Sequence, residues 1–178
     1  FDPAEARRLL REAGYRGQPV TYRLLNNYYT NQVPNAQIVV EMWRAVGLNV
    51  QIEMRENFDQ VTARTPGRAI RDWSNTSLFG DPVAGLLRSF GARTEAERNG
   101  EWTNAEFNTL ADALVASTDM ARRRDLFRRL LEIVEREDPG YLVLHQAASF
   151  TAKRRDIAWR AAKGWPMDFR AGNLRLGA

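Results

Sequence analysis

The stretch VTYRLLNNYYTNQVPNAQIVVEMWRAVGLNVQIEM, residues 20–54, decides the fold, because it predicts a strand, a helix and a second strand. Apolar and polar residues alternate from Val20 to Leu24, which is the pattern of a strand with one buried face. Gly47 stands where a left-handed cap would end the helix, and residues 48–54 alternate again. The helix between them is predicted from an apolar stripe at helical spacing, formed by Ile38, Val39, Met42, Trp43 and Val46.

Two strands connected through a helix are expected to be parallel neighbours with a right-handed crossover. We therefore predict an α/β protein with a mixed, mostly parallel sheet flanked by helices, and a third strand at residues 69–73. Ligands of such sheets bind beyond the carboxyl ends of the strands. The candidate ligand-binding loops are thus residues 26–32, residues 56–58 and the segment after the third strand.

The composition is that of an ordinary folded protein, with 178 residues of which 44% are hydrophobic and 27% charged. This length supports one good core and a small appendage. No apolar run approaches the roughly 20 residues of a membrane helix. The absence of cysteine excludes disulfides, thiolate chemistry and cysteine-based zinc sites. Because the chain begins Phe-Asp-Pro, without Met or a signal peptide, we expect a mature product or, as we favour, a piece of a longer protein.

The net charge of +4 is unevenly distributed along the chain. Residues 153–178 carry seven basic and two acidic side chains, whereas residues 1–152 carry 19 basic and 20 acidic ones. The basic segment is a candidate nucleic-acid surface, and a nucleic-acid-binding module is the alternative function. The arginines of residues 122–138 lie among acidic side chains, so a solvated helix with intrahelical ion pairs is the better interpretation there.

Four further long helices are predicted from the residues at which they start. Asp2-Pro3 and Asp81-Pro82 each combine a capping Asp with a Pro at the first helical position. Thr103 and Glu106 have capping-box spacing, and the strongest helix spans about residues 119–137. The first of these helices should bury Leu9, Leu10 and Ala13.

The remaining segments are predicted as loops or short elements. Residues 91–101 are polar and rich in Gly and charge, which is typical of a surface loop. Residues 58–64 predict a short helix, residues 141–144 a compact apolar strand, and residues 150–152 the start of another strand. From Trp159 onward we expect a loosely structured return segment.

Nothing specific in the sequence supports an enzyme. His145 is the only histidine, and a histidine beside a strand is more often a hydrogen-bonded structural residue than a catalytic base. No phosphate loop, dinucleotide fingerprint, zinc-protease motif or serine-hydrolase motif occurs. We therefore expect no catalysis, no cofactor and no metal site.

The segment that follows the third strand contains the candidate ligand-binding residues. Trp73 ends the strand and small hydrogen-bonding residues follow it, so this segment either forms a ligand wall or closes the edge of the core. Asp81 is a candidate ligand carboxylate, although its Asp-Pro context favours a helix cap. The candidates in this region are Asp72, Trp73, Asn75, Thr76 and Asp81.

An ordered series of motifs runs along essentially the whole chain. It consists of DPAEARRLL at residues 2–10 with AGY at 13–15, EMW at 41–43 before VGLNV at 46–50, Trp73 followed by GDP at 80–82, TD at 118–119, DP at 138–139, and LVLH at 142–145. Together these motifs resemble the C-terminal half of the family 5 solute-binding proteins of ABC importers, the oligopeptide- and dipeptide-binding group.

Members of this family are longer and close two lobes around a ligand, so the resemblance implies an α/β ligand-binding lobe at residues 1–140. Residues 141–178 would be a crossing strand and a basic return segment that packs on the missing first lobe. The implied partners are a peptide or related small solute, the N-terminal lobe and the importer's membrane subunits, with no nucleic acid. The implied location is periplasmic or extracytoplasmic, with a membrane-associated lipoprotein as one form of the full-length protein. Exposed apolar surface would also permit self-association of the fragment.

The resemblance further implies site residues. Family peptide binders place a Trp at the position of Trp73 and, three residues later, an Asp that pairs with the peptide amine; here that position is Thr76. A buried ammonium needs a compensating charge. Asp72 or Asp81 would therefore have to substitute, or the ligand lacks that amine or binds it through water. The loop Asn26-Asn27-Tyr28-Tyr29 matches a family loop that faces the cleft, and its amides and phenols suit polar or backbone-like ligands.

Overall fold

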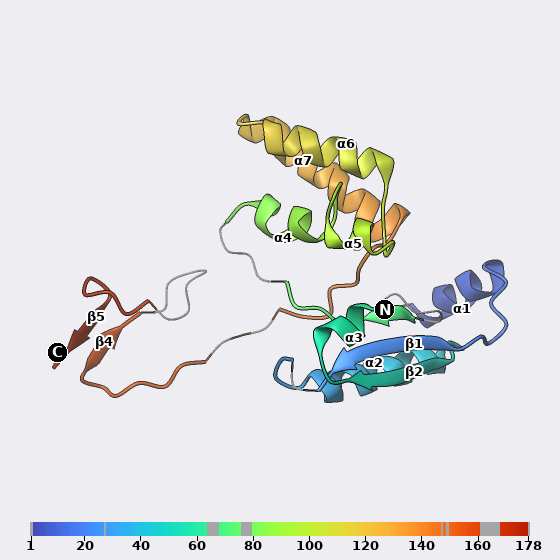
Figure 1. The fold of residues 1–178 in the computed structure, drawn as a ribbon, viewed down its shortest axis with the longest axis horizontal. Coiled ribbons are helices and arrows are strands. Elements are labelled where there is room, and N and C mark those ends of the chain that lie inside the picture. The colour runs from blue at the N-terminus through green and yellow to red at the C-terminus, as the bar shows by residue number, and fades with distance from the viewer. Residues whose placement is uncertain are drawn as a thin grey trace. The chain divides into compact units, whose positions relative to one another are not determined.

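A computed structural model describes residues 2–26, 28–63, 68–75, 80–146, 148, 150–160 and 168–177. The chain divides into two compact units, Phe1–Ser74 and Asn75–Ala178 (Figure 1). This division falls inside the range 1–140 that the sequence predicts as one lobe. A lobe boundary near residue 140 therefore stays a prediction.

The first unit is built on a parallel sheet with the strand order β2-β1-β3. On the central strand, Tyr22 lies opposite Ile52 of one neighbour and Ile70 of the other. The predicted parallel pairing is confirmed, although the third strand ends two residues earlier than expected. The strands are β1 (Val20–Leu25), β2 (Val50–Arg55) and β3 (Arg68–Arg71).

The helix that connects β1 and β2, α2 (Gln32–Ala45), packs on one face of this sheet (Figure 1). Leu24, Val40 and Val50 are fully buried in this layer. Trp43 meets Tyr22 edge to face, with 5.8 Å between the ring centroids. Burying these side chains removes apolar surface from water, which is the main favourable contribution to folding of this unit.

The predicted apolar stripe of α2 is correct for Trp43 but wrong for Ile38 and Met42. Ile38 and Met42 are 61% and 44% exposed. The helix begins at Gln32, six residues before the stripe, and its inward face follows Ala36 and Val40. Because an α-helix turns by 100° per residue, this inward face leaves Ile38 on the opposite side.

The first helix, α1 (Pro3–Glu12), starts as predicted. The Glu5 N–H donates a hydrogen bond to Asp2 Oδ1 at 2.9 Å, and Gly14 follows the helix with a φ of +66°. The predicted buried face is wrong for this structure, since Leu9 is 50% exposed and α1 contains no buried residue. An amphipathic helix buries its stripe only when another surface covers it.

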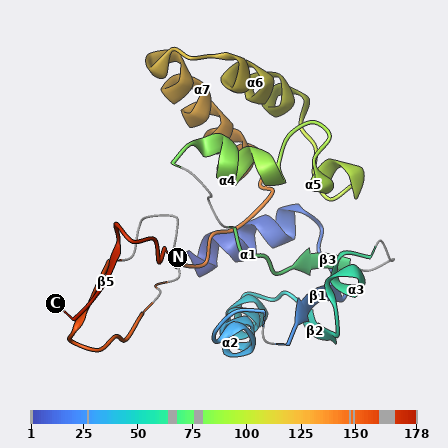
Figure 2. The ribbon, with the colours of Figure 1, turned by 60° about the vertical axis from the view of Figure 1, so that its left-hand side comes forward.

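The second unit is helical over its first half. Figure 2 shows α6 and α7 side by side, with α4 packed across them. A π-helical turn, Ile133–Glu137, continues the last helix. The helices are α4 (Pro82–Ser89), α5 (Glu95–Arg98), α6 (Ala105–Ala116) and α7 (Met120–Glu132).

Capping side chains fix where these helices begin. Asp81 caps α4 as predicted and accepts the Val83 N–H, and Asp119 caps α7 and accepts the N–H groups of Ala121 and Arg122. The capping box at Thr103 is wrong by one residue, because Thr103 donates its hydroxyl to Glu97 and Asn104 caps α6 instead. The expected surface loop at residues 91–101 also contains α5, whose Ala96 is buried.

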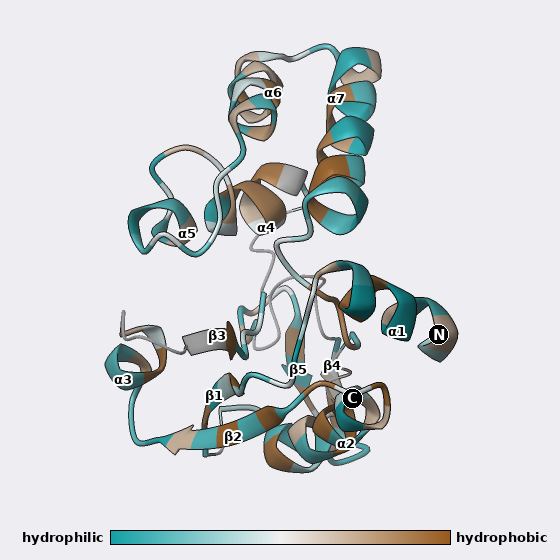
Figure 3. Cartoon of the chain, turned by 90° about the vertical axis from the view of Figure 1, so that its right-hand side faces the viewer, coloured by the Kyte–Doolittle hydropathy of each residue, from teal (hydrophilic) through white to brown (hydrophobic). Residues whose placement is uncertain are grey.

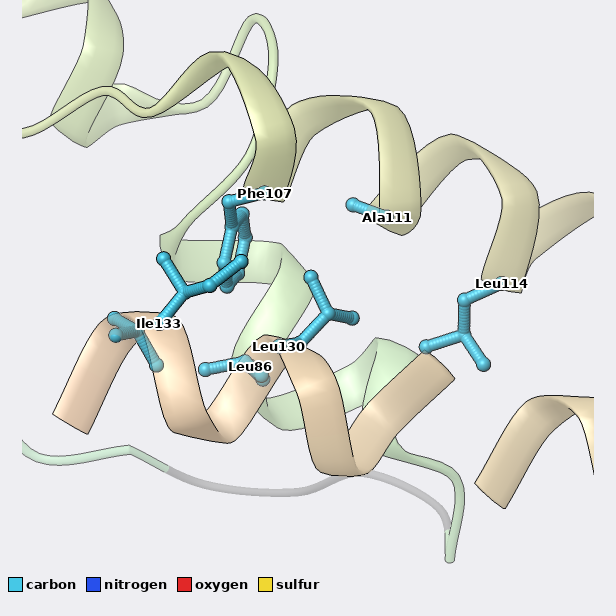
Figure 4. Packing of buried hydrophobic residues seen from close by; sticks show 7 residues of the cluster. Leu86, Phe107, Ala111, Leu114, Leu130 and Ile133 are labelled. Atoms are coloured by element: carbon cyan, nitrogen blue, oxygen red, sulfur yellow. The ribbon is translucent and has the colours of Figure 1, made fainter. Parts of the chain in front are cut away.

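The core of the second unit lies between α4, α6 and the C-terminal part of α7 with its π-helical turn. Leu86, Phe107, Leu114 and Leu130 point toward one another in Figure 4 and are buried. In Figure 3, α7 is hydrophobic on the side that faces α4 and hydrophilic on the opposite side. The 3.6-residue periodicity of the sequence predicted this amphipathic packing.

Replacing Gly140 with alanine is expected to destabilise the second unit by about 1–3 kcal/mol, because the added methyl group overpacks the core. A Cβ at this position would lie 2.9 Å from Phe90 Cε1 and 3.2 Å from Val134 Cγ2. Phe90 has little room to move, since its ring packs against Trp102 and Tyr141. Urea denaturation followed by circular dichroism measures the change.

Gly172→Ala is the matched control for this prediction. No atom of the residues that the structure describes lies within 4 Å of a Cβ built at Gly172, and its φ is not positive. We therefore expect its unfolding midpoint to equal that of the parent chain. A Gly140→Ala midpoint as high as that of the control would contradict the overpacking argument.

The segment after the last helix is extended but unpaired among the described residues. Leu142 and Val143 are each 68% exposed, and residues 141–146 form neither helix nor strand. The predicted strand at residues 141–144 is thus wrong for this structure, because a strand forms only when a neighbour accepts and donates its backbone hydrogen bonds. Residues 150–152 likewise form no strand, and Phe150 is 94% exposed.

The basic segment contains more structure than the sequence predicted. β4 (Ile157–Trp159) and β5 (Leu174–Leu176) form an antiparallel pair. The Trp159 indole N–H donates to the Asp168 carbonyl at 2.8 Å, and Asn173 donates to the same carbonyl at 2.8 Å. These bonds to the connecting segment correct the expectation of a loosely structured return from Trp159 onward.

Candidate ligand-binding site

Three aromatic residues meet beyond the carboxyl ends of the three parallel strands. Tyr28 follows β1, Phe58 begins α3 (Phe58–Thr62) after β2, and Trp73 follows β3. The ring centroids of Tyr28 and Phe58 are 4.9 Å apart, and those of Phe58 and Trp73 are 5.2 Å apart, both edge to face. We call Tyr28, Phe58 and Trp73 the aromatic cluster. The parallel order brings the three loops to one edge of the sheet, as such sheets do for ligands.

The aromatic cluster combines open ring surface with hydroxyl groups. Trp73 is 39% exposed, and Arg71 Cζ lies 4.5 Å from the centroid of its ring. The Tyr28 hydroxyl and Ser74 Oγ are within hydrogen-bond distance, 2.8 Å apart. Exposed aromatic faces beside a few fixed polar groups are typical of small-molecule sites.

A buried polar network lies behind the cluster. Asp72 is only 8% exposed, and its Oδ2 accepts hydrogen bonds from the Tyr29 hydroxyl at 2.9 Å and from Gln32 Nε2 at 3.1 Å. Gln32, the first residue of α2, also accepts the Tyr28 N–H through Oε1 at 2.9 Å. A carboxylate removed from water is retained only when such donors replace the lost water. The network therefore links the loop after β1 to the end of β3.

On the other face of the sheet, Arg23 forms an ion pair and also holds α3, the helix that begins at Phe58. Arg23 is 5% exposed, and its Nε donates to Glu53 Oε2 on β2 at 2.6 Å. The same guanidinium donates to the Ala63 carbonyl at 3.2 Å, just past the end of α3. The hydrogen bond that Glu53 accepts from Arg23 favours the charged carboxylate and lowers the pKa of Glu53. Arg23 thus fixes the short helix that supplies one ring of the cluster.

Burial raises the pKa of Tyr29 to about 12, and the hydrogen bond that its hydroxyl donates to Asp72 is the second cause of this increase. An unfolded tyrosine titrates near pH 10, so the folded state holds its proton more tightly. The associated stability is complete below about pH 10 and is lost as the pH rises toward about 12. We expect Tyr29→Phe to reduce this alkaline loss, measured by comparing unfolding midpoints of parent and variant at neutral and alkaline pH.

Tyrosinate absorbance provides a direct check of the same prediction. One tyrosinate transition should disappear in Tyr29→Phe, and it should be one that lies above pH 10 but below those of Tyr22 and Tyr141, whose pKa values burial raises further. If the transition that disappears lies near pH 10, the hydrogen bond from Tyr29 to Asp72 does not hold the proton.

The other candidate residues from the sequence occupy different places. Asn26 is exposed at the end of β1, and Asn27 and Thr76 lie outside the described residues. Asn75 and Asp81 belong to the second unit, where Asn75 Nδ2 donates to the Gly85 carbonyl at 3.2 Å. Asp81 caps α4 and accepts Arg123 Nη2 at 2.6 Å. Among the candidates, the structure therefore brings Tyr28, Asp72 and Trp73 together.

The sequence assigned no individual role to Phe58, Tyr29 or Gln32, although it placed them in the loops that were expected to face a ligand. Position after a strand pointed to Phe58 and Gln32, and the resemblance to a cleft-facing family loop also pointed to Tyr29. Beyond its place at the end of that loop, Gln32 carried no signal, because a glutamine at a helix start has no characteristic pattern. Its partners, Tyr28 and Asp72, are far from one another in the sequence.

The arginines of α7 are structural, as the sequence indicated, but they bind more than their own helix. Arg129 donates to Glu106 of α6 at 2.8 Å and to Glu137 at 2.5 Å. Arg123, expected on a solvated face, donates to the carbonyls of Leu114 and Ser117 at the end of α6.

His145, the only histidine of the sequence, is exposed. In the part of the chain that the structure describes, no group of three His, Cys, Asp or Glu residues could hold a metal ion, and no helix is long and apolar enough to span a membrane.

The carboxyl edge of a parallel sheet, where the aromatic cluster lies, is the place at which α/β proteins bind ligands. Comparison with known families gives the particular group. Residues 1–95, more than half of the chain, match the model described as bacterial extracellular solute-binding proteins, family 5, middle region. The chain belongs to this family. The sequence-based identification as a family 5 solute-binding protein, and the expectation of a binding protein rather than an enzyme, are confirmed.

Individual relatives and one solved structure are also similar to this chain. The chain is 26% identical over 154 residues to "Di/tripeptide-binding protein 3" of Pseudomonas aeruginosa, covering 82% of this chain and 28% of that protein. It is 23% identical over 145 residues to "Probable deoxycholate-binding periplasmic protein YgiS" of Escherichia coli, covering 80% of this chain and 27% of that protein. The crystal structure of NikZ from Campylobacter jejuni in complex with Ni(L-His) has the same fold, with a TM-score of 0.60, 14% identity, and coverage of 79% of this chain and 31% of that one. The chain thus spans less than a third of the length of these proteins.

Proposed function

We propose that this chain forms the ligand-binding part of a substrate-binding protein that delivers a peptide or a related small solute to an ABC importer. The observation that supports the proposal is the aromatic cluster at the carboxyl ends of β1, β2 and β3, in a chain of family 5. Rings with open faces can receive apolar ligand groups, while the hydroxyls of Tyr28 and Ser74 orient polar ones.

Binding would proceed by closure of this part against an N-terminal lobe. A ligand selects the closed form when it contacts both sides of a cleft. The exposed apolar side chains of residues 142–144 fit the prediction of a strand that crosses to that lobe and pairs there. We propose an extracytoplasmic location, with the importer's membrane subunits as partners, in keeping with the extracellular family.

The chemical class of the ligand is less narrowly defined than the role. Relatives at similar identity are named for dipeptides or tripeptides in one case and for deoxycholate in another. By the family resemblance, Thr76 stands where family peptide binders carry the Asp that pairs with a peptide amine. We therefore propose a peptide or a related small solute and leave a standard free-amine peptide as one outcome of the test.

Native mass spectrometry of the full-length protein tests the proposal. A ladder of bound masses that fits short peptides would support a peptide carrier, and a single non-peptide mass would support a carrier of another solute. The 178-residue chain alone supplies only part of the contacts, so we expect it to bind a peptide pool weakly in a calorimetric titration. Tight binding by the chain alone would contradict the two-sided cleft.

In the described part of the basic segment, no structural observation favours the alternative of a nucleic-acid-binding module. Several of the basic groups in residues 153–178 already have local partners: Arg154 pairs with Asp156, and Arg170 pairs with Asp168. Lys153 Nζ donates to the Ile157 carbonyl at 2.6 Å. A nucleic-acid module would bind DNA or RNA with an affinity that falls steeply with salt, and we expect no such binding.

A further inference from the structure

Asp72 is a buried carboxylate that directly precedes Trp73 of the aromatic cluster along the chain. The proposed binding role does not yet assign it a function. We propose that Asp72 is a positioning residue that fixes the Tyr28 backbone through Gln32, and that the ligand group received by the aromatic cluster carries no ammonium. The inference rests on the proposed function and specifies the chemistry of its ligand. It replaces the expectation that Asp72 substitutes for the family's amine-binding Asp.

The first step is that Asp72 is already occupied from within the protein. Its Oδ2 accepts the Tyr29 hydroxyl at 2.9 Å and Gln32 Nε2 at 3.1 Å, and the residue is 8% exposed. Charge-assisted hydrogen bonds of this kind stabilise a buried carboxylate. A ligand ammonium that displaced these donors would leave them buried without an acceptor, and one that bound beside them would have to reach a side chain that is only 8% exposed.

The second step is that Gln32 transmits the position of Asp72 to the cluster. Gln32 is 2% exposed, so both ends of its amide need partners inside the protein. Its Nε2 donates to Asp72, and its Oε1 accepts the Tyr28 N–H at 2.9 Å. An amide can do both only in one orientation. Asp72 selects that orientation of the amide, and the amide then fixes the position of the backbone that carries the Tyr28 ring.

The third step is the charge at the cluster itself. The guanidinium of Arg71 lies over the Trp73 ring at 4.5 Å. A second cation that stacked on this tryptophan would meet a like charge, and the negative face of the ring already interacts with Arg71. An apolar ligand group without a positive charge fits the cluster better than a peptide amine does.

Amide hydrogen exchange of Tyr28, measured by NMR on the 178-residue chain, tests the positioning role. Asp72→Asn keeps an acceptor oxygen and removes the charge, whereas Asp72→Leu has a similar volume and no acceptor. We expect Asp72→Asn to exchange at the parent rate, and Asp72→Leu to exchange about tenfold faster or more. Gln32→Leu, which interrupts the same link at its other end, should show the same acceleration and decides the question if Asp72→Leu does not fold.

Ser74→Ala is the matched control, because it removes a partner of the Tyr28 hydroxyl and leaves the amide untouched. Its Tyr28 exchange should equal that of the parent chain. Parent-like exchange in Asp72→Leu or, where that variant does not fold, in Gln32→Leu would overturn the positioning role. Acceleration in Asp72→Asn as large as in Asp72→Leu would also overturn it, since charge rather than an acceptor would then be required.

Calorimetry on the full-length protein tests the ligand chemistry with alanyl-phenylalanine and its N-acetyl form. We expect the acetylated peptide to bind at least as tightly, and Asp72→Asn to change both Kd values by no more than about threefold. If the free-amine peptide bound about tenfold or more tightly than the acetylated peptide, the inference would be overturned. This holds whether the preference is lost in Asp72→Asn or in Glu56→Gln and Asp59→Asn, which replace exposed acidic residues. If neither peptide binds, the peptide-carrier proposal fails, and the exchange experiment still decides the role of Asp72.

Discussion

Replacing Trp73 with alanine in the full-length protein is expected to raise the ligand Kd by about 30-fold or more, which corresponds to about 2 kcal/mol. Trp73 is the largest member of the aromatic cluster and is 39% exposed, so much of its ring is open to a ligand. It also contacts Phe58, and its loss would leave that ring without its edge-to-face neighbour. Isothermal calorimetry with the ligand found by mass spectrometry measures the effect.

Two further variants make the Trp73 result specific. Trp73→Phe keeps an aromatic face and should recover most of the affinity. Ile38→Ala removes an apolar side chain that is 61% exposed on the outer side of α2 and should leave the Kd unchanged. If all three variants bind like the parent, the aromatic cluster is not the ligand site and the proposed function loses its supporting observation.

Replacing Phe107 with alanine is expected to lower the free energy of unfolding of the second unit by about 3–5 kcal/mol. Phe107 has no exposed surface and packs among the buried leucines of α4, α6 and α7 (Figure 4). Its ring also meets Trp102 edge to face at a centroid distance of 5.0 Å. The alanine would remove these contacts and leave a cavity that the three helices can close only in part.

Urea denaturation followed by far-ultraviolet circular dichroism measures this change. Val115→Ala lies on the same helix and is the matched control, because Val115 is 60% exposed. It should change the free energy of unfolding by no more than about 0.5 kcal/mol. A Phe107→Ala effect as small as that of the control would mean that the second unit does not fold around this core.

Much of the first unit could be predicted from local sequence patterns. The alternation at residues 20–24 and 48–54 and the Asp-Pro and Gly signals gave the strands, the helix starts and the parallel pairing. Such patterns are reliable when the interactions are short-range, as in a cap three residues from its amide, or when one face of an element is buried throughout. Trp73 and the loop of residues 26–32 followed from the rule that ligands meet the carboxyl ends of parallel strands, and Tyr28 within that loop followed from the family resemblance.

What the sequence could not provide depends on partners that lie outside the local pattern of each element. Asn104 rather than Thr103 caps α6, because Thr103 is engaged by Glu97. Residues 141–144 have the composition of a strand and yet remain unpaired among the described residues, since a strand requires a neighbour.

The candidate site shows the same separation between local pattern and tertiary partner. The sequence by itself determined that Asp72 stands at the end of a strand, next to an aromatic residue and close to an expected ligand site. Only the tertiary structure decided what this carboxylate does, because Tyr29 and Gln32, which lie about 40 residues away along the chain, bury it and donate to it. A charge in an open loop can bind a ligand, whereas the same charge enclosed by donors stabilises the fold around the site.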